Sequence, residues 1–159
     1  MHGLITPAGV AALAAGALLA TAAAQAAGTA QVRWLQPERY ADAGRSEVDR
    51  ARTQEILAEH LRRLCARLPD DQVLQVEVLD LDLAGSVEPW HLRDLRVLRG
   101  RADWPRMSLR YTLSSPARTI KSGQAELSDM HYAFSTRPGE LGHEKHMLEA
   151  WFKDAIATP

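Results

Sequence analysis

The run Val73–Gly85 constrains the fold of this chain more than any other stretch of the sequence. Leu74, Val76 and Val78 alternate with polar residues, which is typical of a β-strand with one buried face. From Leu79 onward the apolar residues fall on the opposite phase, so one face can stay buried only if an extra residue is accommodated. We therefore predict a central strand with a β-bulge at this point, or a local change of the layer that covers it.

Two amphipathic helices flank the remaining strands. Ser46 has the character of a helix N-cap, and the apolar stripe that follows it ends before Pro69. A second stripe begins near His143. Further strands are expected at Val32–Trp34, Arg93–Arg99, Met107–Leu113 and Arg118–Leu127, the last two forming a hairpin, while Ser86–Leu92 is expected to be a loop. This order predicts an α+β fold, a two-layer sandwich in which a mostly antiparallel sheet of four to five strands carries two helices on one face.

The N-terminal segment predicts export. The first 32 residues contain no Asp, Glu, Lys or Arg, and they are rich in Ala and Leu. A small-x-small site, Ala24-Gln25-Ala26, follows the apolar region, so we expect residues 1–26 to be a secretory signal peptide and residues 27–159 to be a single domain. A transmembrane anchor is the alternative, but an Ala-rich segment is only weakly hydrophobic. The expected location is the periplasm, with no membrane span left after cleavage.

Charge and cysteine content exclude some classes of function. The net charge is −1, which gives no support for nucleic-acid binding. Cys65 is the single cysteine, so no disulfide can form within the chain. It lies on the apolar stripe of the first helix, which indicates a core residue and not a catalytic thiol.

Two carboxylates leave the central strand on the same side, those of Asp80 and Asp82. Together with Asp129 or Glu144 they could bind a divalent cation, which would make the protein a metal-dependent hydrolase. The calcium-loop pattern fails, because Ala84 occupies the next ligand position. Pairing of these aspartates with nearby arginines is the interpretation we favour.

An arginine-rich stretch follows the central strand. Six arginines fall between residues 93 and 110, with only two aspartates among them, and they could form a strip that binds an anion. Ordinary surface charge with some Arg–Asp pairing is the alternative. Trp90 and Trp104 flank the stretch and could line a groove or fold over the core. The candidate binding residues are Asp80, Asp82, Arg96, Arg99, Trp104, Arg106, Asp129 and Glu144.

The sequence predicts no catalytic residue, resident metal or cofactor. His143 and His146 are spaced i and i+3, whereas the helical zinc motif needs i and i+4. A nucleophile elbow and a glycine-rich phosphate loop are both absent from the sequence.

Several short motifs together resemble the bacterial family known as domain of unknown function 3016. They are Asp80–Gly85, Arg96–Gly100, Asp103–Arg106, Leu127–Met130 and Glu144–Phe152, and they span nearly all of the expected mature chain. The resemblance implies an exported proteobacterial protein and supplies no catalytic residues. The family has an aromatic residue where this chain has His143, which weakens a metal site there.

These observations favour a small, soluble periplasmic protein of binding or accessory type, whose partner is an envelope component or an anionic ligand. The metal-dependent hydrolase remains the alternative.

Overall fold

The computed structural model describes residues 27–88, 96–100 and 102–158. Residues 1–26, the expected signal peptide, lie outside the described residues, and so do Trp90, Arg93 and Arg101. The elements are β1 (Thr29–Trp34), η1 (Pro37–Arg39), α1 (Glu47–Cys65), β2 (Val73–Asp82), β3 (Ser86–Val87), β4 (Arg96–Val97), β5 (Arg106–Ser115), β6 (Arg118–Ser128), η2 (Tyr132–Phe134), α2 (Gly142–Trp151) and the π-helical segment η3 (Phe152–Ala157).

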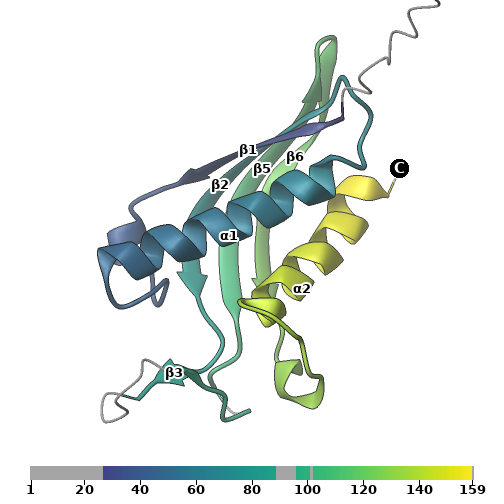
Figure 1. Cartoon of the computed structure of the whole chain (residues 1–159). Helices are drawn as coiled ribbons and strands as arrows, with labels where there is room; N and C mark the ends of the chain where they lie inside the picture. The colour runs from purple at the N-terminus through teal and green to yellow at the C-terminus, as the bar shows by residue number, and fades with distance from the viewer. Residues whose placement is uncertain (1–26, 89–95, 101, 159) are drawn as a thin grey trace, which may run out of the picture.

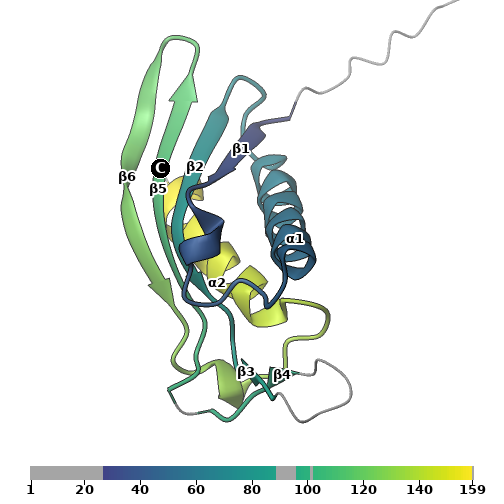
Figure 2. The ribbon, with the colours of Figure 1, turned by 90° about the vertical axis from the view of Figure 1, so that its left-hand side faces the viewer.

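A four-stranded sheet forms one layer and two helices form the other (Figure 1). The strand order is β1-β2-β5-β6, in which β1 runs parallel to β2 and the other neighbours are antiparallel. The helices α1 and α2 lie on the same side of the sheet, as the edge-on view shows (Figure 2). The predicted α+β sandwich is therefore confirmed. In the described part of the chain, no helix combines the length and the apolar character needed to cross a bilayer.

The predicted β-bulge is present in β2. Val78 pairs with Leu109 and Asp80 pairs with Ser108, so Leu79 is an extra residue with no partner of its own. Before the bulge Val78 is buried, and after it Leu81 is buried again on the helix-covered face. One inserted residue thus keeps the apolar side of the strand in the core across the change of phase.

The core lies between the sheet and the helices. Leu57 and Leu61 of α1 pack with Val76 of β2, and Leu148 of α2 belongs to the same cluster. Cys65 is fully buried at the end of α1, and burial raises the pKa of its thiol to about 12. The predicted apolar stripes of both helices therefore face the sheet.

The helix ends are also satisfied locally. Ser46 caps α1: its hydroxyl accepts from the backbone N–H of Asp49 at 3.1 Å, and the Asp49 carboxylate accepts from the Ser46 N–H at 3.1 Å. At the other end of the chain, the ammonium group of Lys121 on β6 donates to the carbonyl of Ala155 at 3.1 Å. This lysine ties the strand to the C-terminal carbonyls of the last helix.

The segment after β2 differs from the prediction. Ser86–Val87, expected to be a loop, pairs antiparallel with Arg96–Val97 as a separate two-stranded sheet. The expected strand Arg93–Arg99 contributes only these two residues among those described, and it does not join the main sheet. The guanidinium of Arg96 is directed at the loop after β2.

His60 predicts how stability changes with pH. It is buried on α1, with its Nε2 atom 3.3 Å from Oε1 of Glu149, and burial lowers its pKa despite that carboxylate, with Arg63 and Lys145 also nearby. In the unfolded chain His60 binds a proton near its ordinary pKa of about 6.5. The contribution of His60 to the free energy of unfolding should therefore be fully present above that pH. It should be lost as the pH drops toward the lower pKa of the folded state.

We expect His60→Gln to flatten this acid loss when the free energy of unfolding is measured by urea titration between neutral and mildly acidic pH. His131→Gln, the same substitution at an exposed histidine, serves as the control. Equal profiles for the native protein and His60→Gln would contradict the assignment.

Candidate functional site

The loop that follows β2 is held by one arginine. Nε of Arg96 donates to the carbonyl of Ala84 at 2.9 Å, and Nη2 donates to the carbonyls of Leu83 at 3.2 Å and Gly85 at 3.0 Å. The same Nη2 lies 2.6 Å from Oδ2 of Asp42. The side chain of Arg96 is only 23% exposed. Arg96 therefore secures three successive carbonyls and is not free to bind an external anion.

A buried carboxylate holds the same loop from the helix layer. Glu144, in the first turn of α2, is 2% exposed, and its Oε1 accepts from the backbone N–H of Ala84 at 2.7 Å. The N–H of Gly85 donates to the carbonyl of Asp103 at 2.8 Å. Gly85 has φ +73°, and a Cβ atom there would lie 2.5 Å from the carbonyl oxygen of Val97. Only glycine fits this position, because both the backbone angle and the space exclude a side chain.

A second group of polar contacts fixes the loop after β4. The guanidinium of Arg99 pairs with Glu88, which is buried, and the backbone N–H of Arg99 donates to Oδ2 of Asp103 at 2.8 Å. The next N–H, that of Gly100, donates to the hydroxyl of the buried Tyr132 at 3.1 Å. Burial raises the pKa of Tyr132, and its hydrogen bond with Asp103 adds to the shift. Arg99 is thus part of a structural network with η2.

The two aspartates of β2 have different partners. Asp82 pairs with the guanidinium of Arg106, as favoured from the sequence. Asp80 instead bonds to the backbone: its Oδ1 accepts from the N–H of Ala41 at 2.9 Å. Trp104 lies beside the pair, with the guanidinium carbon of Arg106 5.6 Å from the centre of its ring. Asp80 therefore holds a loop, and Arg106 and Trp104 form a cation–π contact at the end of the sheet.

The four carboxylates of the hydrolase hypothesis do not meet at one centre. Asp129 orders the turn into η2, because its Oδ1 accepts from the N–H of His131 at 3.1 Å. Asp80 lines a depression beside Leu79, whereas Asp129 lines a groove between β6 and α2. Among the described residues, no group of three or more His, Cys, Asp and Glu side chains could hold a metal ion.

The two histidines of α2 are also separated in their contacts. Nε2 of His146 lies 2.9 Å from Nη2 of Arg137, and the ring of His143 stands edge-on to that of Tyr132, with centroids 5.1 Å apart. Among the described residues, neither histidine belongs to a group of three or more side chains that could hold a metal ion.

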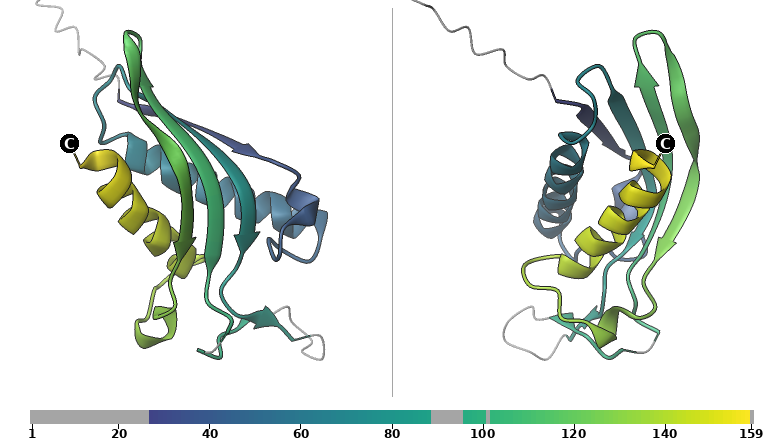
Figure 3. Two further views of the ribbon diagram at one scale, coloured as in Figure 1. Left: turned by 180° about the vertical axis from the view of Figure 1, so that it is seen from behind. Right: turned by 90° about the vertical axis from the view of Figure 1, so that its right-hand side faces the viewer.

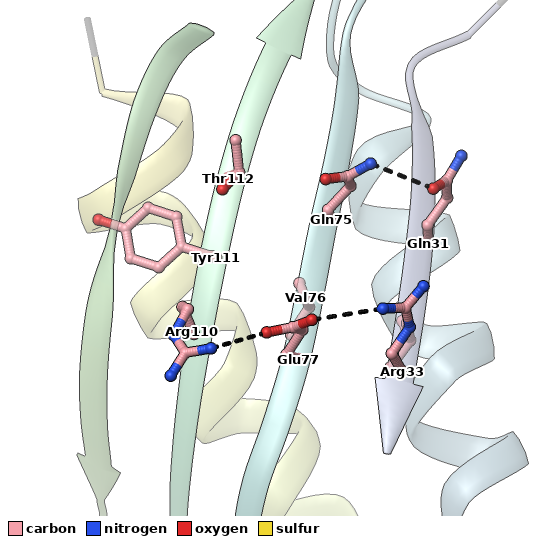
Figure 4. A pocket seen from close by; sticks show the side chains of 9 residues that line it. Gln31, Arg33, Gln75, Val76, Glu77, Arg110, Tyr111 and Thr112 are labelled. Carbon is pink, nitrogen blue, oxygen red and sulfur yellow. Dashed lines mark hydrogen bonds and ion pairs between the residues drawn. The ribbon is translucent and has the colours of Figure 1, made fainter. Parts of the chain in front are cut away.

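The uncovered face of the sheet carries an accessible groove that the sequence reasoning missed (Figure 4). Its volume is about 360 Å³, and it crosses β1, β2 and β5. Arg33, Glu77 and Arg110 form a row across these strands. Nη1 of Arg33 lies 3.6 Å from one Glu77 oxygen, and Nη1 of Arg110 lies 3.0 Å from the other. In the next row Gln75 donates to Gln31 at 3.4 Å.

The row has an excess of positive charge. Two guanidinium groups flank one carboxylate, and the side chains of Arg33 and Arg110 are 75% and 57% exposed, against 31% for Glu77. Each guanidinium has five N–H donors, so most of them remain available after the contact with Glu77. Among the described arginines of the stretch from residue 93 to residue 110, Arg110 is the one that lines this groove.

The groove could not be predicted because the sequence does not show how β1 pairs with β2. Arg33 and Glu77 alternate with apolar residues in their own strands, which indicated an exposed face, but the parallel register that places them side by side follows from the α1 crossover and has no local sequence signal.

Comparison with known proteins gives one match. The family model described as "Protein of unknown function (DUF3016)" matches residues 28–154. Neither the curated proteins nor the solved structures contain a significant match to the chain.

Arg96→Lys tests the role assigned to the arginine. One ammonium group cannot reach three carbonyls and Asp42 in the same geometry, so we expect the free energy of unfolding to fall by about 2–3 kcal/mol. Urea unfolding measures this, with Arg67→Lys, an exposed position after α1, as the matched control. An Arg96→Lys midpoint equal to that of the control would show that the loop does not depend on the guanidinium.

Proposed function

We propose that this chain, which belongs to the DUF3016 family of proteins of unknown function, is an exported binding protein that takes an acidic segment of an envelope partner on the uncovered face of its sheet. The observation that carries the proposal is the row of Arg33, Glu77 and Arg110, in which two exposed guanidiniums share one carboxylate.

The structural contacts of the other charged groups favour a binding function over a catalytic one. Arg96 and Glu144 hold the loop after β2, and Asp129 orders the turn before η2. These contacts are structural and leave the groups with little freedom to act on a substrate. The groove on the open sheet face, by contrast, has exposed donors that point away from the core (Figure 4).

The chemistry of the groove selects an acidic peptide. A carboxylate can accept two parallel hydrogen bonds from a guanidinium, and such charge-assisted bonds are the stronger ones. The amides of Gln31 and Gln75 and the hydroxyl of Thr112 line the same groove, and they can bond to the N–H and C=O groups of a peptide backbone. An acidic segment lying across the strands would use both sets of contacts.

Export is the second part of the proposal. The uncharged, Ala-rich segment that ends in Ala24-Gln25-Ala26 supports secretion to the periplasm, where an envelope partner would be met. The protein for the binding experiment is therefore taken from the periplasmic extract of bacteria that express the full chain. Recovery there of a chain that begins at Ala27 is expected, and a chain found only in the cytoplasm with residues 1–26 retained would contradict export.

The binding prediction uses a fluorescent hexaglutamate peptide and measures its anisotropy at low and high salt. We expect binding that weakens steeply with salt and falls about tenfold or more in Arg33→Gln/Arg110→Gln, since two charge-assisted contacts are lost. Arg67→Gln/Lys153→Gln removes two positive charges at exposed positions outside the groove, so it is the control for overall charge and should bind like the native protein.

A flat salt response, or equal binding by the double variant and the native protein, would contradict the proposed site. Binding of hyaluronate but not of hexaglutamate would overturn the peptide partner in favour of an acidic glycan.

A further inference from the structure

The outer edge of β6 has no strand beside it in the described chain. β6 is the last strand in the order β1-β2-β5-β6 and pairs only with β5 (Figure 3, left). It spans 11 residues, Arg118–Ser128, so one row of backbone N–H and C=O groups along its length is left without a strand partner. A long free edge of this kind is a template for pairing with another strand.

The usual protections of an edge strand are weak here. β6 contains no proline. Its lysine, Lys121, reaches across to the end of the last helix, where it donates to the carbonyl of Ala155. The register irregularity between Leu113 and Ser114 affects only the hairpin end of the strand. From Ser122 to Ser128 the edge therefore has no outward cation, proline or bulge that would discourage pairing.

The charges of β6 suit a second copy of the same strand. Arg118 lies at its start, and Glu126 lies near its end. An antiparallel arrangement reverses one copy, so the basic start of each strand meets the acidic end of the other. A parallel arrangement would place like charges side by side, which is unfavourable.

From this edge and its charge order we infer that two copies of the chain associate through antiparallel pairing of their β6 strands, joining the two four-stranded sheets into one. Pairing centred on Gly123 brings the Arg118 end of each strand to the Ser128 end of the other, which carries Glu126. It also places Ser122 opposite Gln124, and both of these side chains are exposed. This isologous contact closes on itself and stops at a dimer.

The helix layer leaves room for the incoming strand. A groove of about 530 Å³ runs between β6 and α2, and its lining includes Leu127, Trp151 and the small side chains of Ala150 and Ala155. Seen face-on, the C-terminal part of α2 lies beyond β6, on the side where the second strand would add (Figures 1 and 3). The added strand would thus have an apolar surface beneath it as well as an open ladder beside it.

A charge-swap experiment tests the inference. Ser122→Lys/Gln124→Lys places like charges opposite one another across the dimer, and Ser122→Glu/Gln124→Glu does the same with the opposite sign. Light scattering with size-exclusion chromatography should give the native protein twice the chain mass measured by denaturing mass spectrometry, and each variant the single mass. An equimolar mixture of the two variants should return to the double mass.

The matched control is Gln75→Lys/Thr112→Lys, which places two lysines opposite one another on the central strands of the same face. It should remain a dimer. A native protein that is monomeric at high micromolar concentration, or a Ser122→Lys/Gln124→Lys variant that stays dimeric, would overturn the inference.

Hydrogen exchange of the unmodified protein gives a second readout should a variant fail to fold. Amides of residues 122–128 should exchange more slowly as protein concentration rises, and those of the β1 edge should not change. Equal rates in β6 at all concentrations would count against the dimer. Neither readout uses hexaglutamate binding, so failure of the proposed function would leave this inference standing.

Discussion

The contacts of the loop after the central strand hold the layers of this fold together. β2 lies between β1 and β5, and the loop that follows it presents the carbonyls of Leu83, Ala84 and Gly85 and the N–H of Ala84 without strand partners in the main sheet. A buried backbone group that lacks a partner costs about 1–3 kcal/mol. Arg96 of β4 and Glu144 of α2 supply the partners, so the main sheet, the small β3–β4 sheet and α2 are joined at one loop.

This arrangement gives a structural meaning to several of the motifs that carry the family resemblance. Asp80–Gly85 contains the loop, Arg96–Gly100 begins with the arginine that holds it, and Glu144–Phe152 begins with the buried carboxylate. Four of the candidates for metal or anion binding, Asp80, Arg96, Asp129 and Glu144, bond to backbone groups, while Asp82 and Arg106 pair with each other. The groove on the open sheet face, which lies outside these motifs, carries two exposed guanidinium groups.

Much of the fold follows from periodicity. The alternation before and after Leu79 predicted both the central strand and its bulge, because a buried face can survive a change of phase only by an insertion. The stripes of α1 and α2 predicted which helix faces enter the core. These signals are local, and burial imposes them directly on the order of residues.

The site could not be predicted in the same way. Arg96 bonds mainly to backbone carbonyl oxygens, which every residue has. The residue types in the loop therefore give no sign that an arginine binds there. Arg33 and Arg110 belong to one row only after β1, β2 and β5 are aligned, and that register is a tertiary property. Glu144 was considered as a metal ligand because a carboxylate in a helix looks the same in sequence whether it accepts from water, a metal or a buried N–H.

Native-state hydrogen exchange of the Ala84 amide measures whether the loop after β2 is held to the rest of the fold. Bonded to the buried Glu144 carboxylate, this amide should open only with global unfolding and exchange as slowly as the amides of β2. Exchange as fast as in an exposed loop, with the β2 amides still protected, would contradict the account.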